Sequence, residues 1–437
     1  MPPVAHTDHA DVVLPPGRDP VAAVLRDDVG RLEHLVPERH RRMSLSPFTF
    51  FRATAGLMAA DLAATPRSGL LVQACGDAHV SNFGTFATPE RRQVFDLNDF
   101  DETLSGPWEW DIKRLVTSLV LAAREVQFGD EVGQRCAREA VLEYARLLGE
   151  LAGTDALSVW YRRVELERLL DIATEGSVRR SVVTMAREAQ RQTGEKAVRR
   201  FTEVHDGQLR LRSEPPFLVP ARDLVDDEAL DLAWEGVRAS HADYVASLPD
   251  ERRLLVERYE VVDLALKVVG VGSVGTRCFV VLLREPGQER PLVLQAKEAG
   301  RSVLEPYVGS GPYAHQGERV VQGQRLAQAT SDIFLGWCTG PRGHDYYFRQ
   351  ARDMKASMDL SAIRPKVLRS YARLCGNILA LAHARSGDRV ALHEHIGDGA
   401  DLAVALARFG VRYADLVAAD HTAFVAAVAP GGRPEEL

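Results

Sequence analysis

Apolar residues recur at helical spacing along most of the chain, and short strand-like runs interrupt this pattern in two places. Segments 47–64, 110–153, 367–388 and 402–428 place apolar side chains every three or four residues, as amphipathic helices do. Residues 155–250 continue the pattern with more charged residues, and we interpret them as helices with solvated faces. The chain is therefore predicted to contain a large helical region.

The two strand-like stretches differ in size. The first has short apolar runs at 69–75 and 93–97, which predict two strands with a polar loop between them. The second begins near Tyr259 and alternates β-rich runs with Gly, Pro and charged turns. One helical stretch, 317–329, lies between its last two runs. We therefore expect a small antiparallel sheet with one helix packed against it.

These patterns predict an α+β fold with a large helical lobe and a small sheet lobe. We expect a flexible tail over 1–20, a lobe with the first loop and helices over 21–255, a β-rich lobe over 256–360, and a helical segment over 361–437 that completes the large lobe. Because the chain has no internal repeat and no low-complexity linker, the lobes are expected to pack as one unit.

Composition and charge exclude several classes of function. With 437 residues, 46% of them hydrophobic, the chain can form more than one core. A formal net charge of -7 gives no general attraction to nucleic acid or to anionic membranes, so neither is an expected partner. The absence of a signal-peptide pattern, and of any apolar run near the roughly 18 to 20 residues that span a bilayer, predicts a cytoplasmic location. Five scattered cysteines without a CxxC pair predict reduced thiols rather than disulfides or a zinc site.

The first candidate site lies in the loop after the run at 69–75. Asp77 and Asn82 are five positions apart there and can face one point. Asp77 can orient or deprotonate an attacking hydroxyl, and the amide oxygen of Asn82 can bind a divalent metal. The alternative is that the two residues only close an Asx-type turn. His79 is expected to brace the loop through hydrogen bonds.

An acidic run at 95–102 follows the second strand of this stretch. Carboxylates that converge with Asn82 would supply the hard oxygen ligands that Mg²⁺ on a nucleotide requires. The alternative interpretation is a solvated acidic loop. The presence of the loop and the run together favours a magnesium site.

A GxGxxG motif in the second stretch places Gly270, Gly272, Ser273 and Gly275 in one turn. A dinucleotide-binding turn of this pattern has to enter a helix, whereas residues 276–283 are β-branched and apolar and predict a strand. Strand, glycine loop and strand is the arrangement that covers nucleotide phosphates in kinases, because glycine lets backbone N–H groups approach them. The motif therefore predicts a nucleotide-binding loop.

Lys297 lies at the end of the next strand-like run and is the candidate cation for the phosphates that are not transferred. Without the glycine loop it would be interpreted as an exposed lysine at a strand end. A carboxylate should hold such a side chain in place, and Glu305 and Glu318 are both available.

Several long motifs carry a resemblance to a known family. The segments CGDAHVSNFG, FDLNDFDETLSGPWEWDIKRL, KVVGVGSVGTRCFVVLL and LQAKEAGRSVLE resemble the bacterial family of unknown function DUF2252, and the likeness runs over nearly the whole chain. That family is grouped with the protein-kinase-like superfamily, which includes aminoglycoside phosphotransferases and choline kinases. The resemblance implies a two-lobed, protein-kinase-like fold.

The resemblance also implies roles for individual residues. Asp77 matches the catalytic aspartate of the superfamily, and Asn82 matches a metal-binding asparagine. Asp99 matches the metal-binding aspartate, although Asp96 also fits the strand-end pattern and competes with it. The distance along the chain to Asp111, which matches a structural aspartate, favours Asp99.

The chain departs from the phosphotransferase pattern in two ways. Cys75 stands where those enzymes usually have His. The glycine loop and lysine follow the catalytic loop here, whereas they precede it in ordinary kinases, so we expect a circularly permuted arrangement. A cleft between two lobes needs only their juxtaposition, which makes such an order tolerable. Within the family the lysine motif continues as KEAxxSVLE, which favours Glu305 over Glu318 as the partner of Lys297.

The sequence thus predicts an ATP- and Mg²⁺-dependent phosphotransferase that moves a phosphoryl group to a hydroxyl of an unidentified acceptor. A small-molecule acceptor is favoured over a protein. The alternatives are a nucleotidyl transferase on the same fold and a catalytically silent nucleotide-binding or scaffold module. The oligomeric state is left open.

Overall fold

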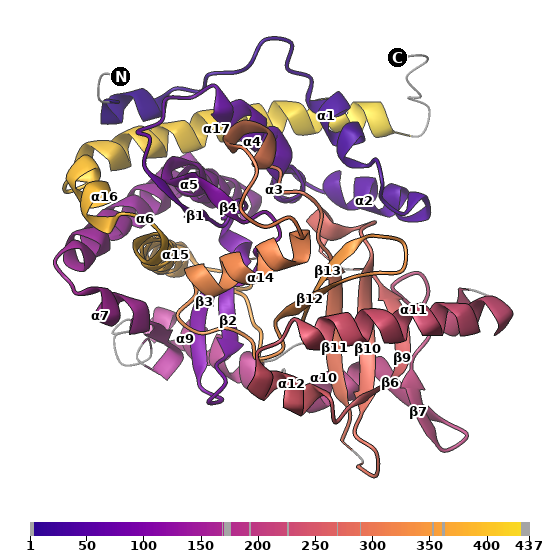
Figure 1. Cartoon of the computed structure of the whole chain (residues 1–437). Coiled ribbons are helices and arrows are strands. Elements are labelled where there is room, and N and C mark those ends of the chain that lie inside the picture. The colour runs from indigo at the N-terminus through magenta and orange to yellow at the C-terminus, as the bar shows by residue number, and fades with distance from the viewer. Residues whose placement is uncertain are drawn as a thin grey trace.

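A helical body and a six-stranded antiparallel sheet lie side by side in the chain, which is an α+β fold (Figure 1). The computed structural model describes residues 4–167, 169, 176–191, 194–224, 227–268, 270–288, 290–351, 354–360 and 363–429. Within these ranges, none of the helices has the length and apolar character needed to cross a bilayer. All five cysteines are buried free thiols, as the sequence predicts.

Four long helices form the centre of the helical body, and one of them, α6, contacts the other three. They are α5 (Trp108–Glu125), α6 (Gly129–Ala152), α15 (Pro365–Ser386) and α17 (Ala400–Val428). Shorter helices lie beside them: α7 (Ala156–Tyr161), α9 (Gly176–Arg191) and α16 (Arg389–Ile396). Leu115, Tyr144 and Phe409 are among the fully buried side chains that join these helices into one core. The helices expected over 110–153 and after 367 are confirmed, and residues 430–437 lie outside the described ranges.

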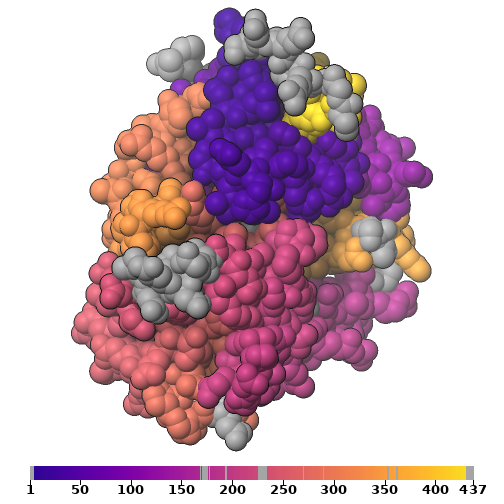
Figure 2. Space-filling view, turned by 90° about the vertical axis from the view of Figure 1, so that its right-hand side faces the viewer, coloured from indigo at the N-terminus to yellow at the C-terminus, as the bar shows by residue number. Residues whose placement is uncertain are grey.

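Short helices in the N-terminal segment cover the helical body and extend towards the sheet, as the indigo surface in Figure 2 shows. They are η1 (His6–Ala10), α1 (Pro20–Asp27), η2 (Glu33–Leu35), α2 (Val36–Met43), α3 (Pro47–Arg52) and α4 (Ala55–Ala63). The single helix expected over 47–64 is thus two helices, separated at Ala53 and Thr54. Part of the expected tail over 1–20 is also folded, because η1 contacts α17 and its His9 is buried.

Two small sheets carry the loops of the first strand-like stretch. β1 (Leu71–Ala74) pairs with β4 (Leu104–Pro107), and β3 (Gln93–Leu97) pairs with both β2 (Phe83–Ala87) and β5 (Val164–Glu165). The strands expected at 69–75 and 93–97 are therefore present, but they belong to different sheets. The sequence interpretation missed β2, since all five of its residues are buried and it lacks the alternation of a half-exposed strand.

The large sheet has the strand order β12-β13-β11-β10-β9-β8, and every neighbouring pair is antiparallel. Its strands are β8 (Leu218–Pro220), β9 (Glu260–Lys267), β10 (Cys278–Arg284), β11 (Leu292–Glu298), β12 (Gly336–Thr339) and β13 (Asp345–Gln350). Successive side chains of β10 enter two different apolar clusters. Val281 packs with Tyr244 and Val256 on one face, and Val280 packs with Phe201 on the other.

The sheet therefore has helices on both faces, whereas one helix was expected. Tyr244 belongs to α11 (Asp227–Ala246), Val256 to α12 (Asp250–Val256) and Phe201 to α10 (Gly194–Phe201). The expected helix at 317–329 is α14 (Gln316–Ala327), which contacts β12 and β13; the short α13 (Glu305–Val308) precedes it. Residues 202–220, expected to be helical, instead form the hairpin β6 (Thr202–His205) and β7 (Gln208–Leu211) and the edge strand β8, followed by η4 (Ala221–Asp223).

Candidate functional site

The loop after β1 carries Asp77 and Asn82, and Asp111 anchors its start. Asp111 lies in the first turn of α5 and is buried. Its carboxylate accepts hydrogen bonds from the backbone N–H groups of Cys75 at 2.6 Å and Gly76 at 2.9 Å. Hydrogen bonds to an ionised carboxylate are stronger than neutral ones, so α5 holds the start of the loop in place.

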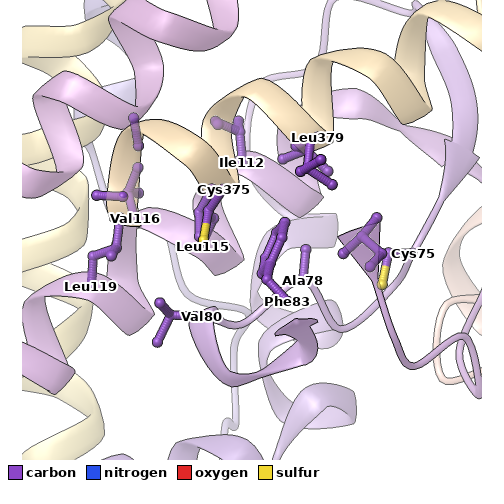
Figure 3. Packing of buried hydrophobic residues seen from close by; sticks show 14 of the residues in the cluster. Cys75, Ala78, Val80, Phe83, Ile112, Leu115, Val116, Leu119, Cys375 and Leu379 are labelled. Carbon is purple, nitrogen blue, oxygen red and sulfur yellow. The ribbon is translucent and has the colours of Figure 1, made fainter. Parts of the chain in front are cut away.

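Apolar side chains fix the rest of the loop to the core of the helical body. Ala78, Val80 and Phe83 are fully buried, and Figure 3 shows them in one cluster with Ile112 of α5 and Leu379 of α15. The 3-10 helix η3 (Val80–Asn82) ends this loop and leads into β2. Because the apolar residues are fixed in the core, the polar residues between them can line a cavity on the other side of the loop.

The acidic run lies directly against this loop. Gly76 has a φ of +82°, and a Cβ added there would lie 2.4 Å from the backbone oxygen of Glu102, so no other residue fits without a shift. The thiol of Cys75 donates a hydrogen bond to the backbone oxygen of Asp99 at 3.2 Å. Cys75 thus makes a bracing contact between the loop and the acidic run.

Asp77 is ionised and held by an arginine. The Nε of Arg114 donates to Asp77 Oδ1 at 2.8 Å, and the same guanidinium donates to the backbone oxygen of Phe51 at 2.6 Å. Burial by itself would raise the pKa of Asp77, but the positive charges of Arg114 and Arg52, with the hydrogen bond from Arg114, outweigh it and keep this pKa below its usual value. A carboxylate with a lowered pKa is a weak base. Asp77 is therefore better suited to orienting a hydroxyl than to removing its proton early.

His79 braces the loop, as expected. Its Nδ1 accepts a hydrogen bond from the backbone N–H of Ser81 at 3.2 Å, and its Nε2 lies 3.6 Å from Asp77 Oδ2. Burial lowers the pKa of His79 to about 3, so the ring is neutral at physiological pH. The side-chain amide of Asn82 donates to the backbone oxygen of Asp77 at 2.8 Å, which leaves its Oδ1 as the atom that can face a cation.

Asp99 and Asp96, the two competing aspartates, have different surroundings. Asp99 lines the cavity, and its Oδ1 is buried without a hydrogen-bond partner among the described residues. Asp96 is 5% exposed, lies outside the cavity lining, and accepts a hydrogen bond from the backbone N–H of Leu97 at 2.8 Å. Burial raises the pKa of Asp96 to about 6. Of the two, Asp99 is thus the one that can meet a ligand in the cavity.

Asp99 and Asn82 both line the cavity, and their side-chain oxygens are of the kind that Mg²⁺ prefers. Burial, followed by the nearby charge of Asp101, raises the pKa of Asp99. Its Oδ1 accepts no hydrogen bond from the described residues, and a cation bound there would add to the offset that Lys297 already provides from 3.6 Å. No group of three His, Cys, Asp or Glu side chains in the described ranges is arranged to hold a metal. Mg²⁺ usually takes only one or two protein carboxylates and completes its shell with phosphate oxygens and water, so a two-residue site suits it.

Lys297 lies near the end of β11 and is 3% exposed. Its Nζ donates to Asp101 Oδ2 at 2.5 Å and lies 3.6 Å from Asp99 Oδ1. The hydroxyl of Tyr347, its cross-strand neighbour on β13, donates to the other oxygen of Asp101 at 2.6 Å. Burial would lower the pKa of Lys297, but the carboxylates of Asp101 and Asp99 raise it well above its usual value. The buried lysine is therefore charged.

The carboxylate that holds Lys297 is not one of the two expected from the sequence. Glu305 is the first residue of α13 and accepts a hydrogen bond from Ser310 at 2.9 Å, and it lies outside the cavity lining. Glu318 lies in the first turn of α14 and is also outside the lining. Both were considered because they follow Lys297 along the chain, whereas the actual partner comes from the acidic run before it.

The glycine motif forms a turn between two strands. Val271–Ser273 are a 3-10 helix, η5, and β10 begins at Cys278, so the motif does not enter the helix that a dinucleotide-binding turn requires. Gly270, Gly272 and Ser273 line the cavity. Gly275 has a φ of +89° and redirects the chain towards β10 without lining the cavity itself.

The N-terminal segment fixes the far side of this glycine turn. Arg31 donates from Nη1 to the backbone oxygen of Val274 at 2.7 Å, and the backbone N–H of Leu32 donates to the oxygen of Gly275 at 2.8 Å. Arg277 donates back to the oxygen of Gly30 at 3.2 Å. Three hydrogen bonds therefore join a loop of the sheet region to residues more than two hundred positions earlier in the chain.

One cavity of about 640 Å³ brings most of these predicted residues together. This volume is in the range of small-molecule and cofactor sites. The residues predicted from the sequence that line it are Asp77, Asn82, Asp99, Gly270, Gly272, Ser273 and Lys297. Gly275 and Glu305 do not line it. The loop after β1, on the side of the helical body, forms one wall, and the glycine turn and β11 form another.

Sequence reasoning missed the roles of several further charged residues in this cavity, among them Asp101, Arg52 and Arg31. Asp101 belongs to the acidic run that drew attention to the site, but nothing in its spacing indicated a pairing with Lys297. Arg52 and Arg31 lie in the N-terminal segment, in which no motif pointed to a ligand. Their place in the cavity depends on how that segment packs, which the local sequence pattern does not encode.

Comparison with known proteins gives a family but no characterised relative. A search of curated proteins finds no match to the chain, and a search of solved structures finds none either. A family model described as "Uncharacterized protein conserved in bacteria (DUF2252)" matches residues 31–427. This match covers the loop after β1, the sheet and the C-terminal helices. The chain therefore belongs to the DUF2252 family.

Proposed function

We propose that the cavity binds ATP with Mg²⁺ and that the protein transfers the terminal phosphoryl group to a hydroxyl of a small-molecule acceptor. The observation that carries this proposal is the convergence of three elements on one cavity: a glycine turn between strands, a buried charged lysine, and an Asp–Asn pair with an unpartnered carboxylate oxygen. Each element suits a different part of a magnesium nucleotide.

The proposal includes a protein-kinase-like arrangement in permuted order. The catalytic loop and acidic run precede the sheet in the chain, and the glycine turn and Lys297 follow later. The cavity between them depends only on their position in space, so the order of the segments does not affect the chemistry. A cytoplasmic location, where ATP is abundant, is part of the proposal and agrees with five buried free thiols.

Each residue would act on a different group. Lys297 would bind the phosphates that are not transferred, and the backbone N–H groups of the glycine turn would cover them. Asn82 and Asp99 would hold Mg²⁺, which would neutralise phosphate charge as it builds up during transfer. Asp77 would accept a hydrogen bond from the acceptor hydroxyl and align its oxygen with the phosphorus.

The reaction would form one bond and break one. The acceptor oxygen would bond to the terminal phosphorus while the bond from this phosphorus to the bridging oxygen of ADP breaks. The hydroxyl proton would pass to Asp77 late in the step and then to solvent, because the lowered pKa of Asp77 disfavours early proton removal.

Labelled nucleotide tests this proposal directly. Purified protein is incubated with Mg²⁺ and ATP carrying a label on either the γ- or the α-phosphate, together with a panel of hydroxyl-containing small molecules. Phosphotransfer predicts that only the γ-label reaches an acceptor. Transfer of the α-label would indicate nucleotidyl transfer, and binding without any turnover would indicate a silent module. A wild-type protein that binds no nucleotide at all would refute every version of the proposal.

Two substitutions in the acidic run provide a matched comparison. Asp99→Asn is expected to lower turnover by at least about a hundredfold, since it removes a charge that holds the metal. Asp96→Asn makes the same change three residues earlier, in a side chain outside the cavity, and is expected to keep wild-type turnover. If Asp96→Asn lowered turnover and Asp99→Asn did not, Asp96 rather than Asp99 would be the metal ligand.

A further inference from the structure

Arg52 lies where the glycine turn meets the catalytic loop. It is the last residue of α3 and lines the cavity. Its backbone oxygen lies beneath the glycine turn, because a Cβ added to Gly272 would be 3.3 Å from it. The two carboxylates whose charges act on its guanidinium are Asp77 and Asp99. Arg52 therefore shares the cavity with the groups proposed to align the acceptor and to hold the metal, close enough for their charges to act on it.

The guanidinium of Arg52 has no hydrogen-bond partner in the described part of the chain, and its Nε is buried. Its one aromatic neighbour there is Phe48, whose ring centre is 6.0 Å from the guanidinium carbon. Two other arginines of the cavity lining are engaged, and the fourth, Arg301, is exposed. Arg31 donates to Val274, and Arg349 donates to the side chain of Gln295 at 3.0 Å.

Arg52 is partly buried, and partial burial of a cation without a hydrogen-bond partner is costly to a folded protein unless water or a ligand satisfies its donors. The five N–H donors of a guanidinium are arranged to bind the oxygens of a phosphate in pairs. The carboxylates of Asp77 and Asp99 attract the guanidinium but form no hydrogen bond with it, so its donors are available to a ligand in the cavity.

We propose that Arg52 binds the terminal phosphate of the nucleotide, the group that is transferred. This inference rests on the proposed function and adds a residue that no motif indicated. Lys297 is paired with Asp101 and is proposed to bind the phosphates that stay with the nucleotide. Arg52 is instead under the influence of Asp77 and Asp99, the residues proposed to act at the phosphate that is transferred. During transfer Arg52 would neutralise charge on the non-bridging oxygens of the phosphoryl group, as an arginine does in other phosphotransferases.

The difference between ATP and ADP binding tests this role without knowledge of the acceptor. Titration calorimetry compares Mg²⁺ complexes of ADP and of an ATP analogue with a β,γ-imido linkage, for wild type, Arg52→Gln and Arg52→Lys. Arg52→Gln is expected to weaken binding of the ATP analogue by about tenfold or more, because charge-assisted hydrogen bonds to the terminal phosphate are lost. Binding of ADP is expected to stay at the wild-type value.

Arg52→Lys keeps the charge but not the paired donors, so it is expected to weaken only the ATP analogue, and by less than Arg52→Gln. Arg41→Gln removes a positive charge from the exposed face of α2, outside the cavity, and should change neither affinity. Should Arg52→Gln fail to fold in a thermal unfolding scan, Arg52→Lys decides the question by the same comparison.

The remaining outcomes separate this inference from the proposed function. Equal weakening of ADP and the ATP analogue would mean that Arg52 supports the glycine turn or the fold, and unchanged binding of both would mean that it has no nucleotide role. Either result overturns the inference while the proposed function stands. A wild-type protein that binds neither nucleotide overturns both.

Discussion

Lys297 and Asp101 form a buried hydrogen-bonded ion pair although they are 196 positions apart in the sequence. Lys297 comes from β11 of the large sheet, and Asp101 comes from the acidic run beside the loop after β1. Tyr347 donates to the same carboxylate, so two neighbouring strands hold it at once. This pair joins the sheet to the helical body at the cavity and keeps Lys297 charged.

Removing one member of this pair should be strongly destabilising. Asp101→Ala leaves the Lys297 ammonium buried without its nearest partner, and breaking a buried pair in this way costs about 3 to 5 kcal/mol. Glu305→Ala, the residue expected from the sequence to hold Lys297, is predicted to change stability by less than about 0.5 kcal/mol. Urea unfolding of both variants measures the difference. Equal losses would mean that the pairing assigned here is wrong.

The close contact between Gly76 and Glu102 gives a second prediction. Gly76→Ala has to place a Cβ 2.4 Å from the Glu102 backbone oxygen, at a φ of +82°. The positive φ costs about 1 to 2 kcal/mol, and the displaced neighbour adds about 1 to 3 kcal/mol. Because the shift moves the loop against the acidic run, we also expect weaker binding of Mg²⁺-nucleotide.

Gly69 is a matched control for this change. It has a similar φ of +87°, but an added Cβ would meet nothing within 4 Å. Gly69→Ala is therefore expected to lose only the stability that the backbone strain costs and to bind nucleotide as wild type does. Denaturant unfolding and nucleotide titration of the two variants isolate the effect of the close contact. If both alanine variants behave alike, the packing of the loop on the acidic run does not matter for the site.

Local sequence pattern was sufficient for much of the fold because most elements carry their own signal. The strand at 93–97 has a compact apolar run, and the glycine motif is flanked by β-branched residues that could only continue as a strand. Asp77 and Asn82 stood out because polar residues follow an apolar run directly. These signals lie within a few residues of the feature that they predict.

The features that were missed depend on contacts between distant segments. The hairpin at 202–211 is rich in charged residues, and its assignment as a strand pair depends on packing against the sheet. The partner of Lys297 was sought along the chain, whereas the fold supplies it from the other side of the cavity. Arg52 is adjacent to the site only because α3 ends against the glycine turn.

The link between Arg31 and the glycine turn gives a third prediction. Arg31→Ala removes the hydrogen bond to the Val274 oxygen, which should let the turn move and weaken nucleotide binding by about three- to tenfold. Arg26→Ala, an exposed arginine in the last turn of α1, is the control and should bind nucleotide as wild type does. Titration measures the affinities, and amide hydrogen exchange of residues 270–276 should be faster in Arg31→Ala alone. Unchanged exchange would mean that Arg31 does not restrain the turn.

The N-terminal 3-10 helix gives a prediction on pH. His9 is fully buried, and neither of its ring nitrogens has a hydrogen-bond partner among the described residues. Burial, followed by the charge of Lys113, lowers the pKa of His9 to about 3. The unfolded chain therefore binds a proton on this ring below pH 6.5 that the folded chain does not bind. It follows that stability falls as the pH drops below 6.5, and that the loss stops near pH 3.

Between pH 7.5 and pH 5 this single group should account for a loss of about 2 kcal/mol. His9→Phe cannot titrate and keeps an aromatic ring at the edge-on contact with Trp108, so the stability that it loses over this interval should be smaller than that of wild type by about this amount. His205→Gln removes an exposed histidine and is expected to keep the wild-type slope. Urea unfolding at a series of pH values measures all three slopes. If His9→Phe follows the wild-type slope, the buried ring is not the source of the acid sensitivity, and η1 does not stay packed on α17 in solution.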